Sequence, residues 1–422
     1  MFGILMLERG GCSVKRVWTA VLCLLILASC CMSVNAAGTA VTDTFTHWTL
    51  AGGAKKAVPM PPVYTVADVV TYRSLGVSDD CGNMVDIDCD DSGNTYVLTD
   101  NSHIVCFDKD LKPVRDYTVT DAAGEEVDFS GAKGIFVDDE HSFYIADTNH
   151  GRVLYVEDGV VQQEIVLPES SLIPSDFVFQ PSGVAKDSKD YLYVISDGSY
   201  YGAILYDPDG VFVGFYGANS VEGNVLTTLA NLWDRLTMND EKRAKIKKTL
   251  PYQFTDIYID NNDFVYTCTA KTESGSVGQM KMLSPGGTNI LPGAESRNFG
   301  ESDQVKRLGN KIRQNFTCIR ADGAGFLYAL DATYGLVYVY DTNATMMAAF
   351  GGGRGLGRQR GVFSIACSMA LSGTRLLVAD SLKNSVTVFE RTAYGELLVQ
   401  AQQLTMDADY LTAEPLWQQV LQ

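Results

Sequence analysis

The sequence predicts an all-β fold, a six-bladed β-propeller, from three observations. A unit of four short strands recurs along the chain, a polar turn separates the first two strands of most units, and the basic spacing is close to 48 residues. A repeat of about 40 to 50 residues with four strands is typical of propeller blades. One such sheet cannot bury both of its faces alone, so the units are expected to close into a ring.

The clearest unit lies at residues 134–167. Residues 134–138 (GIFVD) and 143–147 (FYIAD) are β-forming runs on either side of a polar turn, the pattern of a hairpin. Residues 152–156 and 161–167 supply a third and a fourth strand. This unit therefore predicts a four-stranded antiparallel sheet.

The number of blades follows from the residue that opens the second strand of each unit. Six such markers occur, with spacings of 48, 49, 73, 62 and 49 residues: Tyr96, Tyr144, Tyr193, Tyr266, Tyr328 and Leu377. Six residues before them stand Asp90, Asp138, Asp187, Asp260, Asp322 and Leu371. Short carboxylates accept backbone N–H groups in turns, so these aspartates are expected to be structural.

The two long spacings indicate insertions. In residues 225–250 apolar residues recur three and four apart, which predicts a helical insertion. A second insertion, about residues 291–313, is expected to be a surface loop over one face of the propeller. The pattern becomes helical again near the end of the chain, so short C-terminal helices are predicted, and the propeller itself is assigned to residues 84–399.

The N-terminal segment, residues 1–36, is predicted to be an export signal, with residues 37–83 as a pre-propeller segment. Lys15 and Arg16 precede an apolar run, and small residues follow it. Three endings are compatible with this pattern: cleavage before Ala37, lipidation of Cys30 in a lipobox-like sequence, or an uncleaved anchor. Each of them places the body outside the cytoplasm, secreted or anchored at the outer side of the cytoplasmic membrane.

The charge of the chain disfavours nucleic acid as a partner. Its formal net charge is −18, with 51 acidic and 33 basic residues, and such a field repels polyanions. Six of the ten cysteines follow the signal segment without a CxxC pair. Five of these stand at strand positions that are small or apolar in other units, so they are expected to be buried small side chains.

Residues 134–155 resemble the NHL repeat, whose strand-turn-strand core reads G-I-A-V-D, then S-D-G-N-I-Y-V-A-D-T, then an arginine. The resemblance implies an NHL-type propeller. A longer stretch, about residues 43–422, resembles bacterial proteins in which an exported NHL propeller precedes tetratricopeptide-like helices and a Yip-type membrane domain. Its marks include residues 45–48 (FTHW) and 386–390 (VTVFE). By this resemblance residues 400–422 begin a tetratricopeptide-like unit, and membrane proximity comes from the N-terminus or a C-terminal partner.

Catalytic chemistry has little support in the sequence. Some NHL enzymes, the amidating lyases, hold zinc through several histidines, but this chain has four, of which three fall in the first two blades and His47 precedes them. No G-x-S-x-G or phosphate-loop motif occurs. No catalytic residue, metal site or cofactor is predicted. The alternative is a metal-dependent lactonase or ester hydrolase, gluconolactonase-like, which would use a divalent ion such as calcium.

The favoured prediction is therefore a non-catalytic extracytoplasmic propeller that binds a protein, peptide or carbohydrate near the membrane. Propellers place function where loops of several blades converge. The candidate binding residues follow the second strands or lie in the turns after them: His103, Asp147, Asn149, His150, Asp331, Tyr334 and Asp380.

Overall fold

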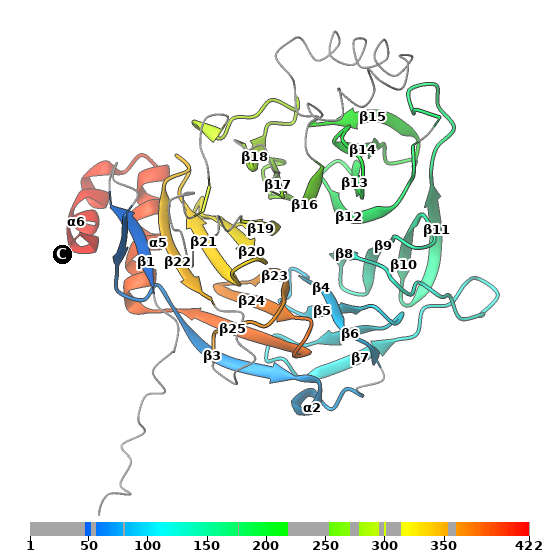
Figure 1. The fold of residues 1–422 in the computed structure, drawn as a ribbon, viewed down its shortest axis with the longest axis horizontal. Helices are drawn as coiled ribbons and strands as arrows, with labels where there is room; N and C mark the ends of the chain where they lie inside the picture. The colour runs from blue at the N-terminus through cyan, green and yellow to red at the C-terminus, as the bar shows by residue number, and fades with distance from the viewer. Residues whose placement is uncertain are drawn as a thin grey trace, which may run out of the picture. The chain divides into compact units, whose positions relative to one another are not determined.

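The computed structural model describes residues 47–51, 56–78, 81–175, 177–217, 253–270, 278–294, 299–300, 314–352 and 360–421. All of them belong to one compact unit, Thr44–Gln422. Their strands form six antiparallel sheets, which are the predicted blades (Figure 1). The export signal at residues 1–36, the helical insertion at residues 225–250 and most of the insertion at residues 291–313 lie outside the described residues.

Three blades consist of four strands that follow one another along the chain. The first contains β4 (Met84–Cys89), β5 (Thr95–Thr99), β6 (Ile104–Phe107) and β7 (Pro113–Tyr117). The second contains β8 (Gly134–Asp139), β9 (Ser142–Asp147), β10 (Arg152–Glu157) and β11 (Val160–Val166). The third contains β12 (Pro181–Lys186), β13 (Leu192–Ser196), β14 (Ala203–Tyr206) and β15 (Phe212–Tyr216).

The other three blades depart from this pattern. The described part of the fourth contains β16 (Phe254–Ile259), β17 (Val265–Thr269) and β18 (Met280–Leu283). The fifth contains β19 (Phe316–Ala321), β20 (Leu327–Asp331), β21 (Leu336–Tyr340) and β22 (Met346–Gly351), extended by β1 (Trp48–Ala51) and β2 (Lys56–Pro59). The sixth contains β23 (Ala366–Ser372), β24 (Arg375–Asp380) and β25 (Ser385–Arg391), with β3 (Tyr64–Thr71) as its outer strand.

The ring is closed by a strand from the N-terminal part of the chain. β3 pairs antiparallel with β25, so that Tyr64 lies opposite Arg391 and Thr71 opposite Ser385. Residues 37–83, which the sequence analysis placed before the propeller, thus supply strands to the fifth and sixth blades. Repeat counting does not find these strands because they precede the first repeat marker.

The innermost strands of the six blades surround a common axis. Contacts run from β4 to β8, β12, β16, β19, β23 and back to β4. Gly134 permits one close approach in this ring, because a Cβ atom there would lie 2.8 Å from the Ser182 carbonyl oxygen of β12. The closed ring confirms the six-bladed β-propeller. Its apolar core is divided into wedges between neighbouring blades, such as the cluster that joins Tyr96 and Leu98 to Phe143 and Ile145.

A hydrogen-bonded Asp–Tyr pair holds the first hairpin of four blades. In the fifth, Asp322 Oδ1 accepts the backbone N–H groups of Ala324 and Phe326, and its Oδ2 accepts the Tyr328 hydroxyl at 2.9 Å. The same pairing joins Asp90 to Tyr96, Asp187 to Tyr193 and Asp260 to Tyr266 at 3.4, 3.1 and 3.0 Å. The turn role predicted for these four aspartates is confirmed.

The prediction of a turn role is wrong for Asp138, and the sixth blade departs in another way. Asp138 pairs with Lys186 Nζ of the third blade at 2.6 Å, because the hairpin of its own blade is short and places a bulge there. In the sixth blade Leu371 lies opposite Leu376 within the ladder. Ser372 therefore takes the place that the aspartate has in other blades.

Two helices follow the last blade directly, α5 (Ala393–Met406) and α6 (Tyr410–Val420). Thr392 caps α5 by accepting the N–H of Gly395 at 3.1 Å, so the helical part begins before residue 400. Trp417 of α6 donates to Thr405 of α5 at 2.9 Å. The one-turn α2 (Tyr72–Leu75) follows β3. Among the described residues, no helix has the length and apolar character to cross a bilayer.

None of the described cysteines forms a disulfide, and most are enclosed by neighbouring blades. Cys106, Cys268 and Cys318 are almost completely buried, while Cys89 and Cys367 are partly buried. Burial raises the pKa of the Cys106 thiol to about 11. These five side chains fill strand positions as the sequence analysis predicted.

We expect Asp322→Ala to destabilise the protein by about 3 kcal/mol, because it removes the turn acceptor and leaves Arg391 and Tyr328 buried beside it without their carboxylate. Asp341→Ala is the matched control, since Asp341 makes the same two turn bonds but has no such side-chain pairs within the described part of the chain. Its expected cost is about 1 kcal/mol. Urea denaturation measures the loss of stability in both variants. Equal losses would contradict a stabilising role for the Asp322 pairs with Arg391 and Tyr328.

Candidate functional site

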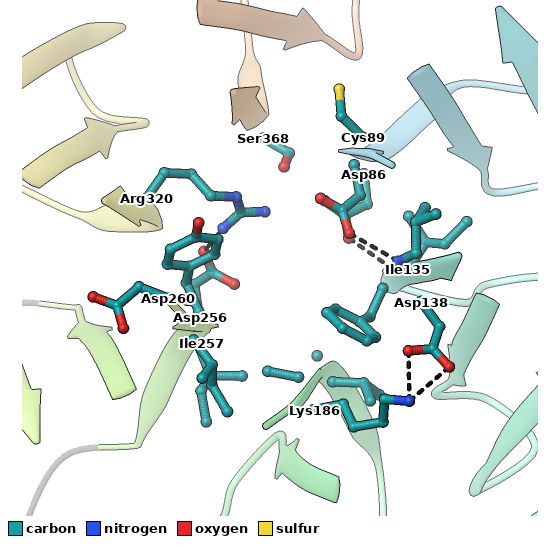
Figure 2. Close-up of a pocket in the computed structure, with 18 of the residues that line it drawn as sticks. Asp86, Cys89, Ile135, Asp138, Lys186, Asp256, Ile257, Asp260, Arg320 and Ser368 are labelled. Atoms are coloured by element: carbon teal, nitrogen blue, oxygen red, sulfur yellow. Dashed lines mark hydrogen bonds and ion pairs between the residues drawn. The ribbon is translucent and has the colours of Figure 1, made fainter. Parts of the chain in front are cut away.

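The inner strands enclose a cavity of about 420 Å³ along the ring axis (Figure 2). All six inner strands contribute to its wall, together with the turns that follow β4, β12 and β16. Nine aspartates and three basic residues are among the described residues that line it. The wall is therefore strongly anionic, and it is the part of the described fold where side chains of every blade converge.

Arg320 of β19 is the cation at the centre of this wall. Its side chain is almost fully buried, and its Nη1 donates to Asp256 Oδ2 of β16 and to the Ile319 carbonyl oxygen, both at 2.7 Å. The guanidinium also lies over the ring of Tyr258, 5.5 Å from its centroid. Carboxylates surround it, and guanidinium groups stay protonated in proteins, so Arg320 is a fixed positive charge in the channel.

Three wall aspartates accept backbone N–H groups from the inner strand of the next blade. Asp86 Oδ2 accepts from Ile135, Asp88 Oδ2 from Val137 and Asp256 Oδ2 from Ile319, each at 2.8 Å. Strand residues two apart point to the same face, which places Asp86 and Asp88 together. The aspartates thus join neighbouring blades and also present carboxylates to the cavity.

Asp86 is a wall residue whose ionisation is strongly changed by its surroundings. Burial raises the pKa of its carboxyl to about 7, although the Arg320 charge and hydrogen bonds from Ser368 and Ile135 oppose that rise. Figure 2 shows Asp86 and Arg320 extending toward each other from opposite sides of the cavity. A carboxyl with a pKa near 7 changes charge in the physiological range, and such groups are concentrated at functional sites.

Lys186 forms a second charged group on the wall. Its Nζ lies 2.6 Å from Asp138 Oδ1 and 2.9 Å from Asp190 Oδ1. Burial alone would lower the pKa of Lys186, but its hydrogen bonds to the two carboxylates raise it above its ordinary value. The turns of the third and fourth blades are joined beside it, where Ser188 donates to Asp263 at 2.7 Å.

Three of the candidate binding residues are buried carboxylates that fasten turns. Asp147 accepts His150 Nδ1 and Arg152 Nε, both at 2.8 Å. Asp331 accepts the backbone N–H groups at residues 315 and 333. Asp380 accepts four backbone N–H groups, at residues 364, 365, 382 and 383. Each carboxylate ties the turn after a second strand to its own blade.

The remaining candidates occupy turns of separate blades. Asn149 is exposed and donates to the Ser130 carbonyl oxygen at 3.1 Å, and Tyr334 packs beside the cluster between the fourth and fifth blades. His103, in the first blade, contacts Asp116. Asp147, Asn149 and His150 share one turn and Asp331 and Tyr334 share another, but none of the seven candidates is among the described residues of the cavity wall. Cys30 lies outside the described residues.

None of the nine wall aspartates was predicted as a site residue, and three of them, Asp138, Asp187 and Asp260, were expected only to fasten turns. A signal for the others exists in the sequence. Residues 86–90 read D-I-D-C-D and residues 256–260 read D-I-Y-I-D, so acidic residues two or four positions apart share one face of an inner strand and the turn that follows it. The innermost strand of a propeller is enclosed by its neighbours, and acidic residues on it require partners there. Counting only loop residues missed this pattern.

The wall carboxylates do not converge on one point. Among the described residues of the channel, no three offer oxygens within 4.8 Å of one another. The Arg320 guanidinium lies between Asp256 and the aspartates of β4, where it already compensates their charge. This geometry does not fit the divalent ion that a lactonase would need.

No protein-family model matches this sequence, and no curated protein matches it. Among solved structures, the selenomethionine form of virginiamycin B lyase from Staphylococcus aureus is 10% identical, with a TM-score of 0.45, over 78% of this chain and 100% of that chain. A streptogramin B lyase is 7% identical, with a TM-score of 0.46, over 78% and 98%. The Cps50 (Swd1) propeller domain of Myceliophteria thermophila is 9% identical, with a TM-score of 0.42, over 78% and 100%. Similarity at this level carries no information on the chemistry of the channel.

We expect Asp86→Asn to gain stability relative to the unaltered protein as the pH rises from 4.5 to 7.5. The Asp86 carboxyl has a pKa of about 7 in the folded chain against an ordinary value of 3.8. At pH values between these two pKa values, the Asp86 carboxyl is ionised mainly in the unfolded chain. Its contribution to the free energy of unfolding therefore falls as the pH rises. Urea denaturation at both pH values measures the difference, and a pH-independent difference would contradict the raised pKa.

We expect Arg320→Met to destabilise the protein by about 3 to 5 kcal/mol at pH 7.5, because it leaves buried carboxylates without their cation. The cost should be smaller at pH 4.5, where Asp86 is protonated. Lys133→Met is the control, since Lys133 is a wall cation in a half-exposed pair with Asp197. Its expected cost is below about 1 kcal/mol. An equal loss of stability in the two variants would show that Arg320 does not stabilise the wall aspartates more than an ordinary half-exposed cation does.

Proposed function

We propose that this chain is a non-catalytic, NHL-type binding propeller whose channel accepts a positively charged side chain of a peptide or protein ligand. The NHL assignment is supported by the Asp–Tyr hairpin pair, which recurs in four blades at the positions of the repeat motif. The binding role is supported by the composition of the channel wall. Binding needs no metal ion or cofactor under this proposal.

The excess of carboxylates on the wall is the observation that carries the proposal. Nine aspartates face three basic residues there, and a cleft lined by one sign of charge concentrates ligands of the other sign. The same field, together with the net charge of −18, disfavours nucleic acid and other polyanions.

The cavity also offers apolar contacts beside the charges. Phe136 and Ile257 are among the described residues that line the wall. Phe136 is partly buried, whereas Ile257 packs mainly in the apolar cluster between the third and fourth blades. A lysine or arginine side chain combines an apolar stem with a charged head. Such a side chain matches this wall better than a bare divalent ion, because no three carboxylates among the described wall residues converge within 4.8 Å of one another.

The location of the protein is part of the proposal. The basic and apolar pattern of residues 1–36 supports export and retention near the outer side of the cytoplasmic membrane. A ligand in that compartment is a protein, a peptide or a carbohydrate, and the charge of the channel favours a basic peptide segment over a neutral sugar.

We expect a pentalysine peptide to bind the full chain at low ionic strength, and pentaglutamate not to bind. Asp91→Asn combined with Asp190→Asn should weaken pentalysine binding by about 10-fold, because two wall charges are lost. The matched control, Asp110→Asn with Asp209→Asn, removes the same charge from exposed outer hairpins. Isothermal titration calorimetry measures all of these affinities.

The proposal fails if pentalysine does not bind, or if the two double variants weaken binding equally. Titration with calcium chloride tests the hydrolase alternative. Calcium binding that Asp86→Asn abolishes would favour that alternative over the peptide ligand.

A further inference from the structure

A second group of chemically reactive side chains lies on the first blade, apart from the channel. Cys81 precedes β4, His103 ends the β5–β6 turn and Asp116 lies on β7. One donor atom from each lies within 4.8 Å of the other two, and the His103 Nδ1 to Asp116 Oδ1 distance is 3.4 Å. No other such group of three is present among the described residues.

These three side chains form a donor set that zinc prefers. A thiolate, an imidazole and a carboxylate bind zinc with bonds of about 2.0 to 2.3 Å, which places tetrahedral ligand atoms about 3.3 to 3.8 Å apart. Because the donor atoms lie within 4.8 Å of one another, each pair needs to approach by no more than about 1.5 Å on this estimate. A thiolate and a carboxylate together also balance the charge of a divalent ion.

The backbone around the three residues holds them in this arrangement. Asn83 donates its N–H and its amide to the two Asp100 oxygens at 2.7 and 2.9 Å, and Asp100 N–H donates back to the Asn83 carbonyl oxygen at 2.9 Å. Gly82 has φ +88°, and a Cβ atom there would lie 2.7 Å from Asn101 Cβ. The segment that carries Cys81 is therefore fastened against the turn that carries His103.

The three candidate ligands differ in solvent accessibility, since the thiol is buried and the other two side chains are partly exposed. Cys81 is 5% exposed, whereas the side chains of His103 and Asp116 are 39% and 54% exposed. An ion could therefore enter from the solvent side and keep a water molecule in its fourth position. The thiol supplies the buried end of the site.

Tyr72 is an independent indication that something is bound here. Its hydroxyl is buried and has no hydrogen-bond partner among the described residues. Tyr72 belongs to the same cluster of buried side chains as Cys81, which places it at the thiol end of the site. A buried hydroxyl without a partner is unfavourable, and a metal-bound thiolate or carboxylate would accept its proton in a hydrogen bond.

We propose that Cys81, His103 and Asp116 bind a zinc ion at the β5–β6 turn end of the first blade, with a fourth position open to water. The ion fastens the segment before β4 to the outer strand β7. This site is separate from the channel and does not depend on the proposed ligand.

Titration of zinc into the reduced full chain should give one tight site per molecule. His103→Gln and Asp116→Asn should each weaken binding by at least about 100-fold, because each removes a direct ligand. His150→Gln is the matched control, since His150 also lies beside two carboxylates, Asp147 and Asp128, but the cluster lacks a cysteine. It should leave zinc affinity unchanged, as should Asp86→Asn in the channel.

Cobalt substitution identifies the thiolate directly. The cobalt-loaded chain should show a thiolate-to-metal charge-transfer band that Cys81→Ser abolishes and Cys106→Ser, at a buried thiol of the same blade, retains. Tyr72→Phe should keep the band and weaken binding by about 10-fold. Absence of a stoichiometric zinc site, a band that survives Cys81→Ser, or equal effects of the His103 and His150 variants would overturn the proposal.

Discussion

Ring closure between β3 and β25 is the constraint on which the rest of the structure depends. The two strands come from opposite ends of the described chain, and a buried polar network secures them. The Tyr64 hydroxyl lies 2.8 Å from that of Tyr328, which donates to Asp322, and Arg391 of β25 pairs with the same carboxylate at 3.0 Å. Only with the ring closed does each inner strand have a neighbour on both sides.

The channel is a direct product of that closure. An aspartate on an inner strand is acceptable because the next blade presents a backbone N–H at hydrogen-bond distance, as for Asp86 and Ile135. In an open row of sheets one of the two end strands would lack such a donor. Carboxylates that give the channel its charge therefore also accept hydrogen bonds that join neighbouring blades. A substitution that changes the charge of the channel will for this reason also change the contacts within the ring.

Repetition determined how much could be predicted from the sequence. The six markers from Tyr96 to Leu377 gave the blade count, because each belongs to a unit with the same hairpin. β3 carries no marker, and its partner strand, β25, lies more than 300 residues further along the chain. Local patterns therefore could not place β3. Asp86 and Arg320 were not predicted as site residues for a related reason, since they occupy inner-strand positions whose facing partners depend on the ring. Cys81, His103 and Asp116 come together only through the fold of one blade.

The long separation between Tyr64 and Arg391 also has a kinetic consequence. During synthesis, β3 leaves the ribosome before any strand of the first blade, yet it belongs to the last blade to be completed. β3 must stay unpaired until almost the whole propeller has been made, and contacts of such high sequence separation slow folding. An unpaired strand with apolar side chains such as Val66 and Val70 is a template for wrong pairing. A chaperone that shields residues 64–71 would therefore raise the yield of correctly closed rings more than one that acts on the middle blades.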